Sequence, residues 1–214
     1  MLAIAGGKGG SGKTTTTLGL AAALDGPTLV VDADCDMPNL HGLAGVDRTP
    51  TLAAVADADP ESVAHDHPDE PGVTVIPAPR SDEDVSDIEP LLSRAASAER
   101  TTLVDCPAGA SPDAVAPLRA ADGVLLVSPL CAAALRDTAK TAAMSRELGT
   151  PVVGAVLTRT RLKPDGVSDL LGCRILAAVP SVRPPVLQTA VVRSAYARLA
   201  SALPVEEDLI RATV

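Results

Sequence analysis

The sequence predicts an α/β protein built on a single doubly wound, mostly parallel sheet with helices on both faces. Two observations carry this prediction. Short apolar runs alternate with helical patterns along the 214 residues, as in sheets covered on both sides. A glycine-rich segment follows the first apolar run directly, where such folds place a ligand-binding loop. The length suits one domain, so we expect residues 1–214 to form a single unit.

The apolar runs predict the strands, and the segments between them with helical periodicity predict the helices. Strands are expected at 2–5, 28–31, 73–76, 102–104, 124–127, 152–157 and 175–178, and helices at 14–24, 88–98, 111–120, 133–148 and 186–203.

Turn and capping residues mark several of these boundaries. Gly26 followed by Pro27 is typical of a helix end, so the first helix should stop there. Ser111 before Pro112 is typical of an N-cap with proline at the first helical position. In the last helix, four-residue spacing predicts a core-facing stripe made of Leu187, Val191, Ala195 and Leu199.

The segment from about 57 to 89 differs in composition from the rest. It holds 11 acidic residues, one basic residue (Arg80) and several prolines, so we expect an acidic surface segment. His65, Asp66 and His67 could bind a metal ion. An exposed loop is the favoured interpretation, because the segment lacks the context of a metal motif.

Composition excludes several classes of protein. Phe and Trp are absent and Tyr196 is the only aromatic residue, which excludes stacking platforms for single-stranded nucleic acid. No apolar stretch approaches a membrane span, and the chain opens with a strand instead of a signal peptide, so we expect a cytoplasmic protein. The four cysteines form no C-x-x-C pair and should stay reduced. A cluster bound by cysteines of two subunits remains an alternative.

The net charge of −9 is unevenly distributed. Residues 1–150 hold 10 basic and 22 acidic residues, whereas residues 151–214 hold 8 and 5. Residues 151–205 could therefore form a basic face for duplex DNA. A solvated, partly salt-bridged surface is the alternative. The basic residues of this stretch are Arg159, Arg161, Lys163, Arg174, Arg183, Arg193 and Arg198.

Residues 7–14 read Gly-Lys-Gly-Gly-Ser-Gly-Lys-Thr, which is the G-x-x-x-x-G-K-[ST] pattern of a phosphate-binding loop. Its glycines let the backbone curl and aim N–H groups at phosphate oxygens. Lys13 should reach the β- and γ-phosphates, and the Thr14 hydroxyl should bind Mg²⁺. The loop lies between a predicted strand and a predicted helix, which is the context that the motif requires.

The same glycines also satisfy the dinucleotide fingerprint G-x-G-x-x-G, with Asp32 following 20 residues after Gly12. Lys13 and Thr14 decide against a dinucleotide. A dinucleotide fold places small or apolar residues there for helix packing, whereas a triphosphate with its metal needs an ammonium group and a hydroxyl.

Acidic residues follow two predicted strands directly. Asp32 and Asp34 come after the strand at 28–31, and Asp105 comes after the strand at 102–104. Because the carboxyl ends of parallel strands share one edge of the sheet, these side chains should line the same cleft as the phosphate loop. Asp105 is then placed as the Walker B acid that holds Mg²⁺.

Residues 8–15 resemble the deviant Walker A motif, KGGxGK[ST]T, of the MinD/ParA ATPases. Residues 32–40, which read Asp-Ala-Asp-Cys-Asp-Met-Pro-Asn-Leu, resemble the switch I segment of that family. Residues 104–109, which read Val-Asp-Cys-Pro-Ala-Gly, resemble its switch II segment. Residues 121–129 and 135–137 also follow the family pattern, so the likeness covers nearly the whole chain.

The resemblance implies a homodimer that traps ATP between its subunits. In this family the lysine that matches Lys8 reaches the partner's phosphates, and the aspartate that matches Asp34 positions the attacking water. The implied catalytic residues are Lys8, Lys13 and Asp34, and the implied Mg²⁺ ligands are Thr14, Asp32 and Asp105. The implied nucleotide contacts are Gly7, Lys8, Gly9, Gly10, Ser11, Gly12, Lys13, Thr14, Thr15 and Thr158.

Thr158 departs from the family, which often has an asparagine there that reads the adenine edge. Threonine has one hydroxyl in place of the separate hydrogen-bond donor and acceptor of an amide side chain. The selectivity of the site for adenine therefore stays open.

The function expected from the resemblance is a Mg²⁺-ATP-dependent switch that hydrolyses ATP slowly, is stimulated by a partner, and positions or partitions cellular cargo. Residues 203–214 contain a proline and three consecutive acids, so a direct membrane anchor is not expected. A protein scaffold or activator and duplex DNA both stay open as partners. An iron–sulphur or metallocofactor maturation ATPase of the same superfamily is the alternative function.

Overall fold

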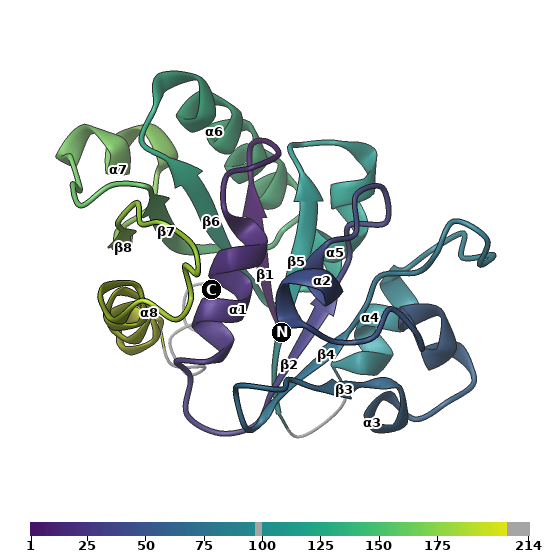
Figure 1. The fold of residues 1–214 in the computed structure, drawn as a ribbon. Coiled ribbons are helices and arrows are strands. Elements are labelled where there is room, and N and C mark those ends of the chain that lie inside the picture. The colour runs from purple at the N-terminus through teal and green to yellow at the C-terminus, as the bar shows by residue number, and fades with distance from the viewer. Residues whose placement is uncertain (97–99, 205–214) are drawn as a thin grey trace.

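The computed structural model describes residues 1–96 and 100–204 and shows an eight-stranded sheet with helices on both faces (Figure 1). The strand order is β3-β4-β2-β5-β1-β6-β7-β8, and all neighbouring pairs are parallel except β3 with β4. This topology confirms the predicted doubly wound α/β fold. The strands are β1 (Leu2–Gly6), β2 (Thr28–Asp32), β3 (His65–Asp66), β4 (Val73–Ile76), β5 (Thr101–Ala108), β6 (Gly123–Pro129), β7 (Val152–Thr158) and β8 (Ile175–Val179).

Side chains of the central strands alternate between two buried layers. Ala3 and Ala5 of β1 contribute to one hydrophobic cluster, whereas Ile4 contributes to the other. Strands that are buried on both faces need apolar residues at successive positions. This is why short continuous apolar runs, and not polar–apolar alternation, predicted the strands.

The helices divide between the two faces of the sheet (Figure 1). One face is covered by α1 (Lys13–Ala21), α2 (Leu40–Ala44) and α8 (Ala190–Ala202). The opposite face is covered by η1 (Leu52–Ala56), α3 (Pro60–Val63), α4 (Glu89–Ala95), η2 (Pro112–Ala114), α5 (Val115–Ala120), α6 (Ala132–Glu147) and α7 (Asp165–Leu171).

The first helix is shorter than predicted. It ends at Ala21, with Ala22 as its C-cap, and not at 24. Gly26 therefore does not cap the helix; it takes a left-handed conformation, with φ of +87°, in the turn that leads into β2.

The last helix begins at Ala190 and not at 186, because the chain first passes Pro184 and Pro185 and then makes a turn. The predicted core-facing stripe is therefore wrong for its first two residues, Leu187 and Val191. Leu187 precedes the helix, and Val191 is 37% exposed. The buried face carries Val192, Ala195, Tyr196 and Leu199.

His65 and Asp66 form a short antiparallel strand with β4, so the expectation of a loop is wrong there. Pairing with β4 gives these residues a strand conformation that their own propensity does not favour. The Nε2 atom of His65 lies 3.1 Å from the carbonyl oxygen of Pro50. Within residues 1–96 and 100–204, no three His, Cys, Asp or Glu side chains form a group that could hold a metal ion.

The remaining differences concern short elements. The predicted helix at 111–120 is divided into η2 and α5. Ser111 is the N-cap as predicted, but its side chain makes no capping hydrogen bond. The helix predicted at 88–98 is α4, and its predicted end lies outside the described residues. Helices α2, α3 and α7 are too short for periodicity to reveal them.

The absence of a membrane anchor was predicted from residues 203–214, most of which lie outside the described part of the chain. In that described part, no helix has the length and apolarity that crossing a bilayer requires.

Candidate nucleotide-binding site

The predicted phosphate loop connects β1 to α1 at the carboxyl edge of the sheet. Gly10 and Gly12 have φ of +72° and +96°, a left-handed conformation that glycine adopts without steric cost. Gly12 is also the N-cap of α1, so the first turn of this helix faces the loop. Free N–H groups at a helix start attract anions.

The start of the loop is packed too closely for any side chain. A Cβ atom on Gly7 would lie 2.3 Å from backbone atoms of Asp137 and Thr138 in α6. The N–H of Gly7 donates to the Thr138 hydroxyl at 3.3 Å, and the N–H of Gly109 donates to the Gly6 carbonyl at 2.9 Å. Contacts with α6 and with the segment after β5 therefore hold the start of the phosphate loop in place.

The two lysines of the loop have different surroundings. Lys13 is only 7% exposed at the start of α1, whereas Lys8 is exposed near the loop tip. Neither lysine belongs to an ion pair among the residues that the structure describes. Both ammonium groups are thus available for phosphates, one inside the site and one at its rim.

Several polar groups of the loop lack protein partners. The Ser11 Oγ atom is buried, and no hydrogen-bond partner for it exists in the described residues. In the same set, the N–H of Gly12 has no hydrogen-bond acceptor, whereas the N–H of Ser11 faces the Lys8 carbonyl across the turn at Gly9 and Gly10. Buried polar groups are normally satisfied, so unpaired ones at one place indicate a ligand.

The acids Asp32 and Asp105 lie side by side, because they are direct partners in the register of β2 and β5. Both are almost fully buried. Asp32 accepts hydrogen bonds from the N–H groups of Asp34 (3.0 Å) and Leu40 (3.2 Å). The hydroxyl of Thr17 lies 3.3 Å from Asp105 Oδ1. The structure thus brings these two predicted ligands together beside α1.

Burial changes the protonation of this pair. Burial is the largest cause that raises the pKa of Asp32 to about 7, and the charge of Asp105 adds to it. Burial also raises the pKa of Asp105 to about 6, while a hydrogen bond from Thr14 and the charge of Lys13 lower it. Two buried carboxylates that resist ionisation favour a cation between or beside them.

Asp34 lies in the loop after β2 and is partly exposed. Its Oδ1 atom accepts a hydrogen bond of 3.0 Å from the N–H of Met37, which closes a short turn. The Met37 side chain is 74% exposed. Asp34 is therefore at the opening of the site, and the contribution of its charge to the pKa of Asp105 shows that it is close to the buried acids.

The end of β7 contacts the phosphate loop from the other side. The hydroxyl of Thr158 donates to the Ser11 carbonyl at 2.7 Å, and the Arg159 guanidinium donates to the Gly10 carbonyl at 2.6 Å. Thr158 also lines a pocket of about 160 Å³ between Gly12 and the segment 179–182. Thr158 is thus near the phosphate loop, and its hydroxyl proton is already engaged by the Ser11 carbonyl.

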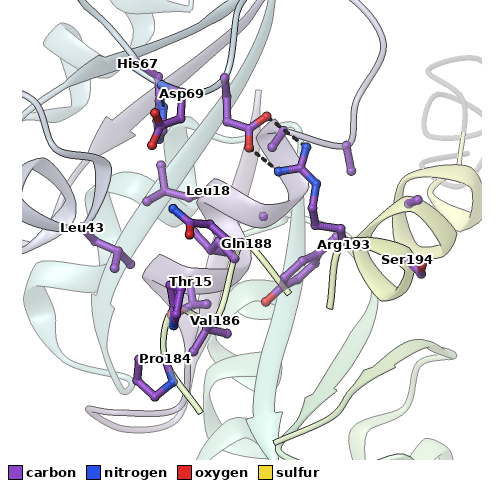
Figure 2. A pocket seen from close by; sticks show the side chains of 18 residues that line it. Thr15, Leu18, Leu43, His67, Asp69, Pro184, Val186, Gln188, Arg193 and Ser194 are labelled. Atoms are coloured by element: carbon purple, nitrogen blue, oxygen red, sulfur yellow. Dashed lines mark hydrogen bonds and ion pairs between the residues drawn. The ribbon is translucent and has the colours of Figure 1, made fainter. Parts of the chain in front are cut away.

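A larger groove of about 610 Å³ lies on the outer side of α1, between α8 and the segment around Leu43 (Figure 2). It shares Thr15, Val186 and Tyr196 with the smaller pocket. Arg193 lies at its edge and pairs with Glu70. Thr15 therefore lies between the groove and the phosphate loop.

The C-terminal basic residues are not all free. Arg193 pairs with Glu70, Arg159 binds the phosphate loop, and the Lys163 ammonium donates to the Leu176 carbonyl. The basic side chains of this stretch that remain exposed without such a contact in the described chain are Arg161, Arg174, Arg183 and Arg198.

The cysteines do not gather around one another. All four are free; Cys106 is buried, Cys173 is partly buried, and Cys35 and Cys131 are exposed. Although the Cys35 residue is exposed, partial desolvation of its thiol and the nearby carboxylates raise its pKa to about 11, which disfavours the thiolate that a metal would need.

These residues fit a magnesium nucleotide. The left-handed glycines, the unpaired N–H of Gly12 and the buried lysine suit phosphates, and the buried acids beside Thr14 suit a divalent cation. Two contacts were missed from the sequence: Thr138, which binds Gly7, and Arg159, which binds Gly10. No local pattern predicts them, because they depend on where α6 and β7 are placed by the sheet order.

The fold and the site together define a P-loop nucleotide-binding protein. A model of the CobQ/CobB/MinD/ParA nucleotide-binding domain matches residues 2–195, so the chain belongs to this family. It is a P-loop ATP-binding domain of the MinD/ParA type, as the motifs predicted.

Individual relatives agree with this assignment. An uncharacterized ATP-binding protein of Methanocaldococcus jannaschii is 32% identical over 195 residues, which cover 84% of this chain and 73% of the relative. An iron–sulfur cluster carrier protein of the same organism is 28% identical, over 72% of this chain and 58% of the carrier. The septum site-determining protein MinD of Pyrococcus horikoshii, solved with Mg-ADP, superposes with a TM-score of 0.82 at 26% identity, over 93% of both chains.

Proposed function

We propose that this protein is a Mg²⁺-ATP-dependent dimeric switch that hydrolyses ATP slowly, and that residues 1–214 act as one ATPase domain. A protein activator or scaffold completes its cycle, and the switch positions or partitions cargo in the cytoplasm. The different surroundings of Lys8 and Lys13 are the observation that carries this proposal.

Lys13 is buried at the base of the loop and can neutralise phosphates within its own subunit. Lys8 is exposed at the rim and forms no ion pair among the described residues. An exposed cation beside a phosphate site can reach a nucleotide held by a second subunit. Positive charge supplied in trans stabilises the charge that develops during phosphoryl transfer, and is worth ~10³–10⁵ in rate in comparable systems.

The other residues supply positioning. Gly7 to Thr15 surround the phosphates, with the Gly12 N–H group as a donor. Thr14, Asp32 and Asp105 would hold Mg²⁺, which neutralises phosphate charge when bound. Asp34 at the opening of the site orients the attacking water. Thr158 lines the smaller pocket, where we place the contact with the base.

The test is the mass of the protein in solution with ATP and with ADP, measured by light scattering. Wild type should dimerise with ATP only, and Lys8→Ala should stay monomeric and lose hydrolysis while it still binds ADP. Lys140→Ala removes an exposed lysine of α6 and is the matched control. An unaltered monomer–dimer shift in Lys8→Ala would refute the trans role.

An iron–sulphur maturation ATPase is the second candidate, because one relative is a cluster carrier. The exposed Cys35 and Cys131 are the thiols that two subunits could share. Anaerobic reconstitution with iron and sulfide, followed by absorption spectroscopy, tests this candidate. A cluster that Cys35→Ala and Cys131→Ala abolish would favour the carrier function over the switch.

A further inference from the structure

Arg159 has an unusual backbone conformation. Its φ of +58° makes it the one non-glycine residue with positive φ in residues 1–96 and 100–204. Residues with a Cβ atom rarely adopt this conformation, and they keep it where surrounding contacts enforce it, often beside functional sites. Arg159 follows β7 directly, next to the phosphate loop.

The side chain of Arg159 forms a hydrogen bond with the phosphate loop. The Arg159 Nη2 atom donates to the Gly10 carbonyl at 2.6 Å, and the preceding residue, Thr158, donates to the Ser11 carbonyl at 2.7 Å. The last residue of β7 and the residue that follows it thus hold two successive carbonyls of the phosphate loop.

These two bonds determine where the loop N–H groups point. In a trans peptide unit, the C=O and the following N–H point in opposite directions. When the carbonyls of Gly10 and Ser11 point to β7, the N–H groups of Ser11 and Gly12 point away from it. The N–H of Gly12 has no acceptor in the described protein, and that of Ser11 faces the Lys8 carbonyl across the turn at Gly9 and Gly10.

The tip of the loop has little other support. A Cβ atom on Gly9 or Gly10 would meet nothing within 4 Å, so the tip projects into open space. The bond from Arg159 is the one side-chain hydrogen bond made to residues 8–10 within the described chain, beside the backbone turn at Gly9 and Gly10. Two adjacent glycines have wide backbone freedom, so an unsupported tip would sample many conformations.

We propose that Arg159 is a positioning residue that holds the loop tip through the Gly10 carbonyl, and thereby fixes the direction of the Lys8 side chain and of the phosphate-binding N–H groups. Arg159 acts through the loop and needs no contact with the nucleotide. The consequence for dimerisation rests on the proposed function, whereas the ordering of the tip does not.

Arg159→Gly tests this role, because glycine keeps the left-handed backbone and removes only the guanidinium. We expect the backbone order parameters of Gly9 and Gly10, measured by ¹⁵N relaxation without nucleotide, to fall from a rigid value near ~0.85 to below ~0.6. We also expect ATP-dependent dimerisation and kcat to fall roughly 10- to 100-fold, since small misplacements cost that much. Resistance to denaturant should not decrease.

Arg80→Gly is the control, because it removes an exposed arginine from a loop in the acidic segment and should change none of these values. Unchanged order parameters in Arg159→Gly would overturn the proposal. If wild type fails to dimerise with ATP, the proposed function fails, while the relaxation measurement still decides whether Arg159 orders the tip. A loss of stability with normal order at the tip would assign Arg159 a purely structural role.

Discussion

The acids of β2, of β5 and of the loop after β2 have different surroundings. Asp32 and Asp105 are buried cross-strand partners, whereas Asp34 is partly exposed. Burial keeps the pKa of Asp32 near 7 and that of Asp105 near 6, so a cation stabilises their ionised forms. Asp34 lies at the opening of the site, and it is the acid that we propose to orient the attacking water.

The pKa of Asp32 predicts how stability depends on pH without Mg²⁺. The folded protein binds protons at Asp32 and Asp105 more tightly than the unfolded chain, in which such groups titrate near 3.8. The free energy of unfolding should therefore fall as pH rises from about 4 to about 7, by up to ~1.4 kcal/mol per pH unit for each proton, and then level off. Urea unfolding across this range measures the slope.

Asp32→Asn should flatten this slope, whatever it does to stability at a single pH. The exposed Asp25→Asn is the control and should leave the slope as in wild type. Stability that instead rises between pH 5 and pH 7 would show that the acids are ionised and paired in the folded protein.

Asp34→Ala should slow ATP hydrolysis roughly 10²-fold or more, because the water loses its orienting carboxylate. ATP-dependent dimerisation should persist, since the phosphate loop is intact. Phosphate release and light scattering measure the two effects. The neighbouring Asp36→Ala removes an exposed acid from the same segment and should keep normal turnover. Equal turnover in both variants would remove Asp34 from the mechanism.

At the level of elements, α1 links the nucleotide site to α8. Gly19 in the middle of α1 packs against the ring of Tyr196, the single aromatic residue of the chain. The Tyr196 hydroxyl lies 3.4 Å from the Thr16 hydroxyl on the same helix. Tyr196 and Thr15 also form walls of both the groove and the smaller pocket. The α1–α8 contact is thus both a core contact and a boundary of the site.

Gly19→Ala tests this contact. A Cβ atom there would lie 2.3 Å from ring carbons of Tyr196, so the ring must move. The cost of moving the ring outweighs the higher helix propensity of alanine. We expect a net loss of about 1–3 kcal/mol in the free energy of unfolding, measured by urea titration. Gly166→Ala in α7, where a Cβ atom would meet nothing within 4 Å, should be neutral or stabilising. A stability of Gly19→Ala equal to that control would show that Tyr196 relaxes freely.

For the whole molecule, the charge distribution bears on which surface the proposed switch would use. The net charge is −9, and three of the C-terminal basic side chains are already bound to protein groups. Few arginines remain for phosphates of DNA, and the acidic first part of the chain repels them. These charges favour a protein scaffold over duplex DNA.

We therefore expect the ATP-bound, hydrolysis-blocked Asp34→Ala dimer to show no binding of labelled duplex DNA by fluorescence anisotropy near physiological salt. The titration is repeated with ADP and at tenfold lower salt. A surface with four phosphate contacts would gain roughly three to four orders of magnitude in affinity over that change. Binding with ATP only, falling steeply with salt, would contradict this expectation and identify DNA as the surface.

The local sequence predicted most of the fold and the phosphate loop, because these depend on short-range patterns. Apolar runs located the seven longer strands, and residues 7–14 carry their own spacing of glycine, lysine and threonine. Helix ends were less well predicted. The buried face of α8 depends on how Tyr196 packs against Gly19, which no periodicity near 186–203 reveals.

The sequence by itself determined the P-loop, its position between a strand and a helix, and the acids that β2 and β5 carry, since each is encoded within a few consecutive residues. The prediction that Asp105 follows its strand is wrong, because β5 continues to Ala108. Only the tertiary structure decided which distant groups surround the loop. The sheet order places β6 and β7 beyond β1, and this brings Thr138 to Gly7 and Arg159 to Gly10 across more than a hundred residues of chain. It also buried Lys13 and left Lys8 exposed, because exposure depends on packing between elements and not on the motif they share.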